Sequence, residues 1–145
     1  MPYADNNGVR IHYQVEGEGQ PLVLHHGLMS ELESWRSLGY VSPLKRDYRL
    51  ILMDGRGHGD SDKPHDPEAY AMEHRVDDVA AVLDVLGIDD AHFFGYSMGG
   101  AIGFRFAKLA PDRVKSLIIG GASPTELNLR ARDRLLGLLQ SGPEG

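Results

Sequence analysis

The segment Gly95-Tyr96-Ser97-Met98-Gly99 is the most informative chemical motif of the sequence. A serine flanked by glycines at two residues' distance is typical of a sharp turn between a strand and a helix, which pushes the hydroxyl clear of the backbone. The apolar run 91–96 would be that strand, and several small residues follow on the expected helix. Small side chains let a helix approach a strand closely. We therefore predict that Ser97 is a nucleophile that Gly95 and Gly99 help to present.

A second motif, His25-His26-Gly27-Leu28, ends another apolar run. A serine that attacks a carbonyl group needs two N–H donors for the oxyanion that forms. We expect one from Met98, which follows Ser97 at a helix N-terminus, and the other from Leu28. Gly27 would give this loop its shape, and His26 would support it by packing or hydrogen bonding. Adjacent residues on an extended segment point to opposite faces, so the two histidines predict no metal site.

The sequence offers no clear base for this serine. Such a hydroxyl normally gives its proton to a histidine, yet no histidine occurs after residue 92. His58 lies in the glycine-rich loop 54–61 and could be mistaken for a base. We favour a structural role, in which Asp54, Arg56 and His58 hold one another and the neighbouring turns. His12, His65 and His74 are expected to be exposed or helical, without a catalytic arrangement.

The composition is that of a globular domain, with 145 residues, 41% hydrophobic and 25% charged. A net charge of −6 disfavours a nucleic-acid partner, and the absence of cysteine excludes a thiolate metal site. No apolar run approaches the ~20 residues of a membrane span, and no secretory signal is visible, so we expect a cytoplasmic protein without a membrane partner. No phosphate-binding Gly-x-Gly-x-x-Gly motif accompanies the serine.

Apolar runs alternate with helical patterns along the chain, which predicts a doubly wound, mostly parallel α/β sheet. Residues 2–4 and 9–16 would form an antiparallel hairpin before it. The expected buried strands are 21–25, 49–53, 91–96 and 114–120. The expected helices are 30–44, opened by a capping box at Ser30 and Glu33, then 72–86, 98–109 and 124–140.

Together the motifs resemble the α/β-hydrolase superfamily, most closely its esterase, lactonase and perhydrolase-type members. They are His-Gly-x after the first buried strand, Asp-x-Arg-Gly-His-Gly-x-Ser after the second, and Gly-x-Ser-x-Gly-Gly. The resemblance implies a cofactor-free enzyme that hydrolyses a small-molecule ester, lactone or related acyl substrate through an acyl-enzyme on Ser97. It places Trp35 at the entrance of the substrate pocket. Dehalogenases and most epoxide hydrolases of this fold carry aspartate in place of Ser97, which disfavours both chemistries.

The resemblance also implies that the sequence is an incomplete fragment. Residues 1–123 would be strands one to six of an eight-stranded sheet, and residues 124–145 the start of a truncated helical cap. The triad acid and histidine of such enzymes come later in the chain, so this fragment alone would be inactive. The alternative is a non-catalytic binding or interaction module. In either case strand 114–120 would leave an open edge, which favours self-association.

Overall fold

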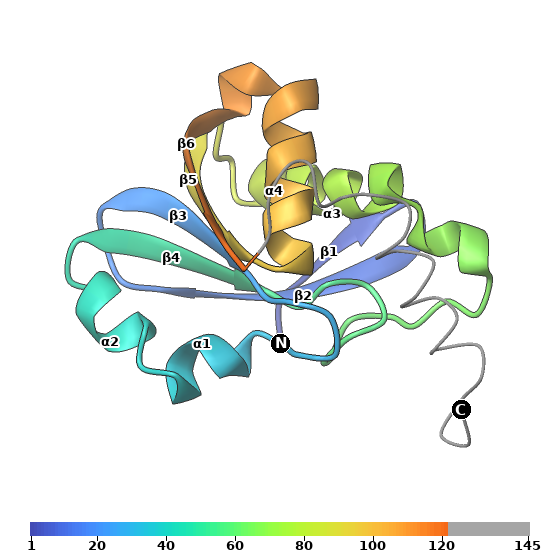
Figure 1. Ribbon diagram of the computed structural model, residues 1–145, viewed down its shortest axis with the longest axis horizontal. Coiled ribbons are helices and arrows are strands. Elements are labelled where there is room, and N and C mark those ends of the chain that lie inside the picture. The colour runs from blue at the N-terminus through green and yellow to red at the C-terminus, as the bar shows by residue number, and fades with distance from the viewer. Residues whose placement is uncertain (122–145) are drawn as a thin grey trace.

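Six strands of the computed structural model form one mixed sheet (Figure 1), and the structure describes residues 1–121. The order across the sheet is β1-β2-β4-β3-β5-β6. The strands are β1 (Tyr3–Asn6), β2 (Val9–Glu16), β3 (Gln20–His25), β4 (Tyr48–Met53), β5 (Ala91–Tyr96) and β6 (Val114–Gly120). β2 pairs antiparallel with β1 and β4, and the remaining pairs are parallel. This confirms the predicted mostly parallel sheet with an N-terminal hairpin.

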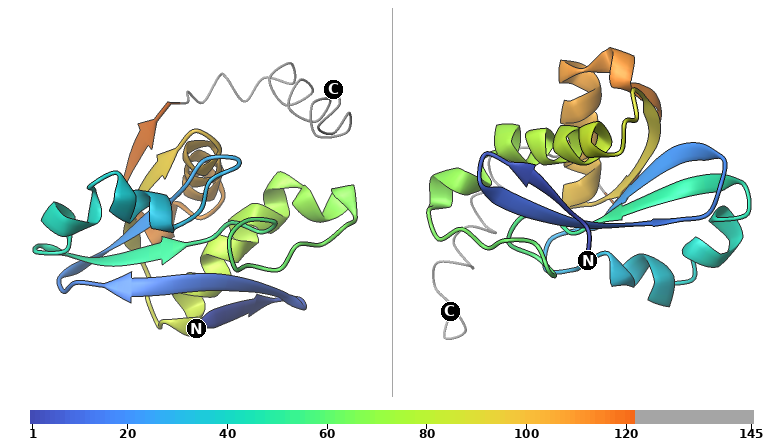
Figure 2. Two further views of the ribbon diagram at one scale, coloured as in Figure 1. Left: turned by 90° about the horizontal axis from the view of Figure 1, so that it is seen from below. Right: turned by 180° about the vertical axis from the view of Figure 1, so that it is seen from behind.

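Helices cover both faces of the sheet (Figures 1 and 2). The longer helices, α3 (Met72–Val85) and α4 (Met98–Leu109), lie on one face, and the short helices α1 (Glu33–Ser37) and α2 (Val41–Leu44) lie on the other. Two 3-10 turns, η1 (Pro67–Tyr70) and η2 (Pro111–Arg113), precede α3 and β6. Within residues 1–121 no helix is both long and apolar enough to cross a membrane.

The central strands are buried on both faces, which explains their continuous apolar runs. On β3, Val23 belongs to the core cluster under α3 and α4, whereas Leu22 and Leu24 belong to the cluster under α1 and α2. All three side chains are nearly or fully buried. The sheet is therefore the shared wall of two hydrophobic cores.

The single helix expected at 30–44 is wrong. The structure has the two short helices α1 and α2, and Gly39 between them takes a φ of +87°, which favours glycine. The capping box does not form, because Leu32 is the N-cap of α1 and its N–H donates to Asp54 Oδ1 at 2.8 Å. A carboxylate at the end of β4 thus takes the place of the side-chain cap. The helix expected at 124–140 lies outside the described residues.

The N-terminus of α4 packs directly on the backbone of β3 and β5. A Cβ atom added to Gly95 would overlap the backbone of Gly99 and Gly100, and one added to Gly99 would overlap the carbonyl groups of His25 and His26. Only glycine allows so close an approach. This contact fixes the position of the β5–α4 turn relative to the end of β3.

We expect Gly99→Ala to lower the free energy of unfolding by about 2 kcal/mol or more, because the new methyl group must displace backbone. Gly27→Ala is the matched control at the same junction, since its Cβ would meet Ser97 Cβ at 3.3 Å and the backbone has no positive φ. Its loss should be clearly smaller. Urea denaturation of both variants measures the difference, and equal losses would contradict the close packing.

Candidate active site

Ser97 occupies a strained turn between β5 and α4. Its φ of 53° and ψ of −113° are rare for a residue other than glycine. The backbone secures this conformation, because the Ser97 N–H donates to Gly120 O at 2.7 Å and the Ser97 carbonyl accepts from the Ala101 N–H at 3.0 Å. The side chain is partly exposed and makes no capping bond to α4. Its hydroxyl is therefore not consumed by the helix that it begins.

The loop after β3, residues 26–29, lies against this serine. An added Cβ on Gly27 would stand 3.3 Å from Ser97 Cβ, so the two segments are in contact. Among the hydrogen bonds of residues 1–121, none uses the N–H of Leu28 or the N–H of Met98. Met98 is the first residue of α4, where backbone N–H groups have no partner within the helix. The structure thus leaves both predicted oxyanion donors without a protein acceptor in its described part.

His26 ties loop 26–29 to the loop after β4. Its Nδ1 donates to Gly27 O at 2.7 Å, and its Nε2 accepts from the Gly55 N–H at 2.9 Å. Burial lowers the pKa of His26 to about 4, and burial also lowers the pKa of the neighbouring His25 to about 3. Both rings are therefore neutral near pH 7. His26 is thus hydrogen-bonded to this loop, and its supporting role stays a prediction.

His58 contacts the same loop rather than Ser97. Its Nε2 accepts from the Met29 N–H at 3.1 Å, and its Nδ1 lies 3.0 Å from Arg56 O. Burial, more than any charged neighbour, lowers the pKa of His58 below its usual value. No hydrogen bond joins its ring to Ser97 in residues 1–121, which is consistent with the structural role that we favoured.

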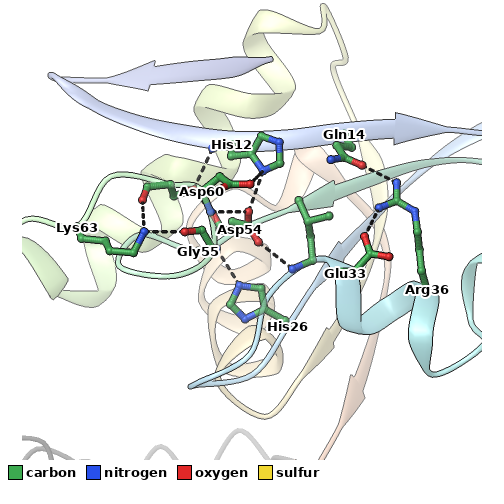
Figure 3. A network of polar contacts seen from close by, with 12 residues as sticks. His12, Gln14, His26, Glu33, Arg36, Asp54, Gly55, Asp60 and Lys63 are labelled. Carbon is green, nitrogen blue, oxygen red and sulfur yellow. Dashed lines mark hydrogen bonds and ion pairs between the residues drawn. The ribbon is translucent and has the colours of Figure 1, made fainter. Parts of the chain in front are cut away.

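Asp54 organises the surrounding loops (Figure 3). The carboxylate is buried, and its oxygens accept from the N–H groups of Leu32 and Asp60 and pair with His12 Nδ1 at 2.8 Å. His12, Asp54 and Asp60 offer possible metal-ligand atoms within 4.8 Å of one another. The hydrogen bonds of Asp54 already account for this geometry, so we assign no metal to it.

His12 corrects the sequence analysis, which expected it to be exposed. Its exposed fraction is 1%, because loop 54–61 folds over β2 and Ser61 Oγ accepts from the His12 N–H at 2.9 Å. Arg56 is also held differently from the expectation. It forms two bonds of 2.7 Å to Asp78 of α3, and both side chains are buried. Asp78 lies off the apolar face that the sequence predicts for helix 72–86, so no sequence signal indicated this pair.

Trp35 lies in a hydrophobic core. It is 4% exposed and packs edge-on against Phe94 and Tyr40, with ring centroids 5.1 Å and 5.3 Å away, in the core under α1 and α2. Helix α1 turns this side chain toward the sheet rather than toward solvent. The structure therefore brings together Ser97, Gly27 and His26, with Leu28 and Met98 adjacent in the chain, but not Trp35.

The chain is similar to known proteins in sequence and in fold. The family described as alpha/beta hydrolase fold matches residues 20–142. The chain is 36% identical over 149 aligned residues to a putative carbamate hydrolase, RutD, of Azorhizobium caulinodans, with 99% of the chain and 54% of that protein covered. It is 37% identical over 115 residues to epoxide hydrolase 3 of Siraitia grosvenorii, with 79% of the chain and 36% of that protein covered.

A solved structure is similar in both sequence and fold. It is that of Est816, described as an N-acyl homoserine lactone degrading enzyme, with a TM-score of 0.76 and 38% identity over 81% of this chain and 44% of that one. The chain spans about half, or less, of the length of the relatives that it matches. The match over most of its residues shows that the chain belongs to the α/β-hydrolase fold family.

Proposed function

We propose that this chain carries the nucleophile and the oxyanion site of a serine hydrolase that acts on a carboxylic ester, lactone or related acyl substrate. The observation that carries this proposal is the conformation of Ser97. It is held at a φ of 53° at the start of α4, with a hydroxyl that caps nothing and with two neighbouring N–H groups unused in residues 1–121.

In this mechanism Ser97 Oγ bonds to the carbonyl carbon of the substrate while the Leu28 and Met98 N–H groups stabilise the oxyanion. The bond to the leaving alcohol then breaks, the alcohol takes the proton lost by the serine, and water hydrolyses the acyl-enzyme. The proton carrier is not among the seven histidines of the sequence, since all lie in residues 1–92 and none bonds to Ser97 in the described part. We assign it to a segment such as the longer relatives possess beyond the matched region.

The choice of an acyl substrate rests on the nucleophile and on the relatives. RutD is described as a putative carbamate hydrolase and Est816 as an enzyme that degrades an N-acyl homoserine lactone. Both kinds of substrate contain a carbonyl carbon, and an oxyanion site serves attack on such a carbon. Epoxides have no carbonyl group, and the position of the nucleophile in this chain holds a hydroxyl rather than a carboxylate. We therefore favour acyl transfer over epoxide opening.

A Ser97→Cys variant tests the site without a base. The sequence has no cysteine, so the introduced thiol is unique. Alkylation by iodoacetamide reports how accessible and how ionised this thiol is, whereas acylation by p-nitrophenyl acetate also passes through an oxyanion. Relative to the control Ser37→Cys, at an exposed position of α1, we expect the ratio of acylation rate to alkylation rate to rise by about 10- to 100-fold.

Equal ratios in the two variants would show that no oxyanion site faces residue 97. Failure of the Ser97→Cys thiol to react with either reagent would show that the side chain at this position is inaccessible. Either result would contradict the proposed function.

A second candidate function is association with another copy of the chain. β6 is the last strand of the sheet, so in residues 1–121 its outer edge has no neighbour. Ile118 on this strand is 52% exposed, and it lines an apolar cavity of about 380 Å³ together with Tyr40 and Phe94. We expect a second copy of the chain to pair with the outer edge of β6, because two identical edge strands can pair about a two-fold axis.

We expect the chain to associate with increasing concentration, and Ile118→Lys to weaken this association by at least tenfold, because a charged side chain disfavours edge pairing. Val85→Lys is the matched control, since Val85 is 56% exposed at the end of α3, away from β6. Sedimentation velocity measures both. A monomer at every concentration, or equal effects of the two substitutions, would refute this second function.

A further inference from the structure

A turn over residues 27–30, within and just after loop 26–29, holds a strained residue. The Ser30 N–H donates to Gly27 O at 3.2 Å, which closes a four-residue turn with Leu28 and Met29 at its centre. Met29 takes a φ of +66°, as the third position of a type II turn requires, although it is not glycine. Its side chain is 79% exposed and therefore gains little from packing. Something other than the Met29 side chain must hold the turn in this form.

The contact that holds it is the bond from the Met29 N–H to His58 Nε2 at 3.1 Å. In a type I turn, which methionine accommodates readily, the central peptide is rotated and its N–H points elsewhere. A hydrogen-bond acceptor at the place of His58 therefore selects the type II form. The Leu28 N–H, the proposed oxyanion donor, belongs to the preceding Gly27–Leu28 peptide, whose Gly27 carbonyl closes the same turn.

The two contacts of His58 fit one protonation state. Nδ1 lies 3.0 Å from Arg56 O, and a carbonyl only accepts, so Nδ1 carries the hydrogen. Nε2 is then the acceptor for the Met29 N–H. A proton on Nε2 would place two donors against each other at 3.1 Å.

The groups around His58 determine the pKa at which Nε2 takes up a proton. Burial and the positive charges of Arg75 and Lys63 lower the pKa of His58. The Arg56 carbonyl and the Asp54 carboxylate raise this pKa, but the net effect is a lowering. The His26 ring, with its centroid 5.0 Å away, is neutral near pH 7. Because the folded pKa lies below 6.5, the neutral ring contributes stability that is present above pH 6.5 and lost as the pH falls below it.

We propose that His58 is a positioning residue, whose neutral ring holds the Leu28–Met29 peptide in its type II orientation, beside the Leu28 N–H that is the proposed oxyanion donor, and whose protonation releases this peptide. His26 fixes the other end of the loop through Gly27 O and the Gly55 N–H, so release is confined to the turn. The catalytic consequence rests on the proposed function, whereas the contact of His58 with Met29 does not.

Amide hydrogen exchange of Met29, followed by NMR in the 145-residue chain, tests this inference. In the unsubstituted chain we expect the protection factor of the Met29 amide to fall at least tenfold between pH 7.5 and the acid end of the His58 titration. His58→Gln supplies an acceptor that does not titrate, so protection should persist across this range. His58→Leu supplies none, so protection should be low throughout. His65→Gln, at an exposed histidine of the same segment, should behave as the unsubstituted chain does.

Protection that is independent of pH in the unsubstituted chain, or that survives in His58→Leu, would overturn the inference. If His58→Leu fails to fold, the comparison of the unsubstituted chain with His58→Gln still decides, since a merely structural role gives both the same pH profile. Acylation of the Ser97→Cys thiol separates the two proposals. A pH-dependent turn with no acceleration of acylation would refute the proposed function alone, and accelerated acylation with a pH-independent turn would refute this inference alone.

Discussion

The arrangement depends on one steric constraint, the contact of backbone with backbone where α4 meets the ends of β3 and β5. Gly95 and Gly99 lack side chains at the two points where any Cβ would overlap main chain. This approach brings the N-terminus of α4, the turn at Ser97 and loop 26–29 together. In the proposed mechanism the positive end of the helix dipole faces the place where negative charge develops on the substrate. A geometric requirement of packing thus creates an electrostatic feature.

Loop 54–61 holds the neighbouring strand, helix and loop in place through hydrogen bonds of its buried polar groups. Asp54, Arg56 and His58 reach β2, α3 and loop 26–29 respectively, each through hydrogen bonds of 3.1 Å or less. Burying such groups is costly unless their hydrogen bonds are made, and a satisfied network then favours a single arrangement. His12 Nε2 is one exception within the described residues, since it is buried without a partner. The network therefore specifies loop positions more than it adds stability.

The sequence predicted the parts of the fold that depend on local pattern. The bounds of β5, β6 and α4 agree with the prediction because an apolar run and a glycine-rich turn define them from their own residues. The single helix at 30–44 was wrong because Gly39, with its positive φ, divides it into α1 and α2. Its start was also wrong, because the Leu32 N–H bonds to Asp54, 22 residues further along the chain. His12 was misplaced for a related reason, since alternation along β2 cannot reveal that a distant loop covers its outer face. The same holds for the candidate site. The local motif indicated Ser97, whereas the contact of His58 with Met29 joins two distant loops and could be seen only in the folded structure.

In residues 1–121 no histidine is hydrogen-bonded to Ser97, yet the proposed oxyanion site does not depend on one. The proposed oxyanion donors are backbone groups, and their positions follow from the packing of β3, β5 and α4, all within residues 1–121. A base acts on one proton, whereas the donors act on the charge of the transition state. In serine hydrolases the oxyanion site and substrate binding alone retain ~10³–10⁴-fold of the acceleration over water when a triad member is removed. In the proposed mechanism the two functions are therefore separable in energy as well as in sequence.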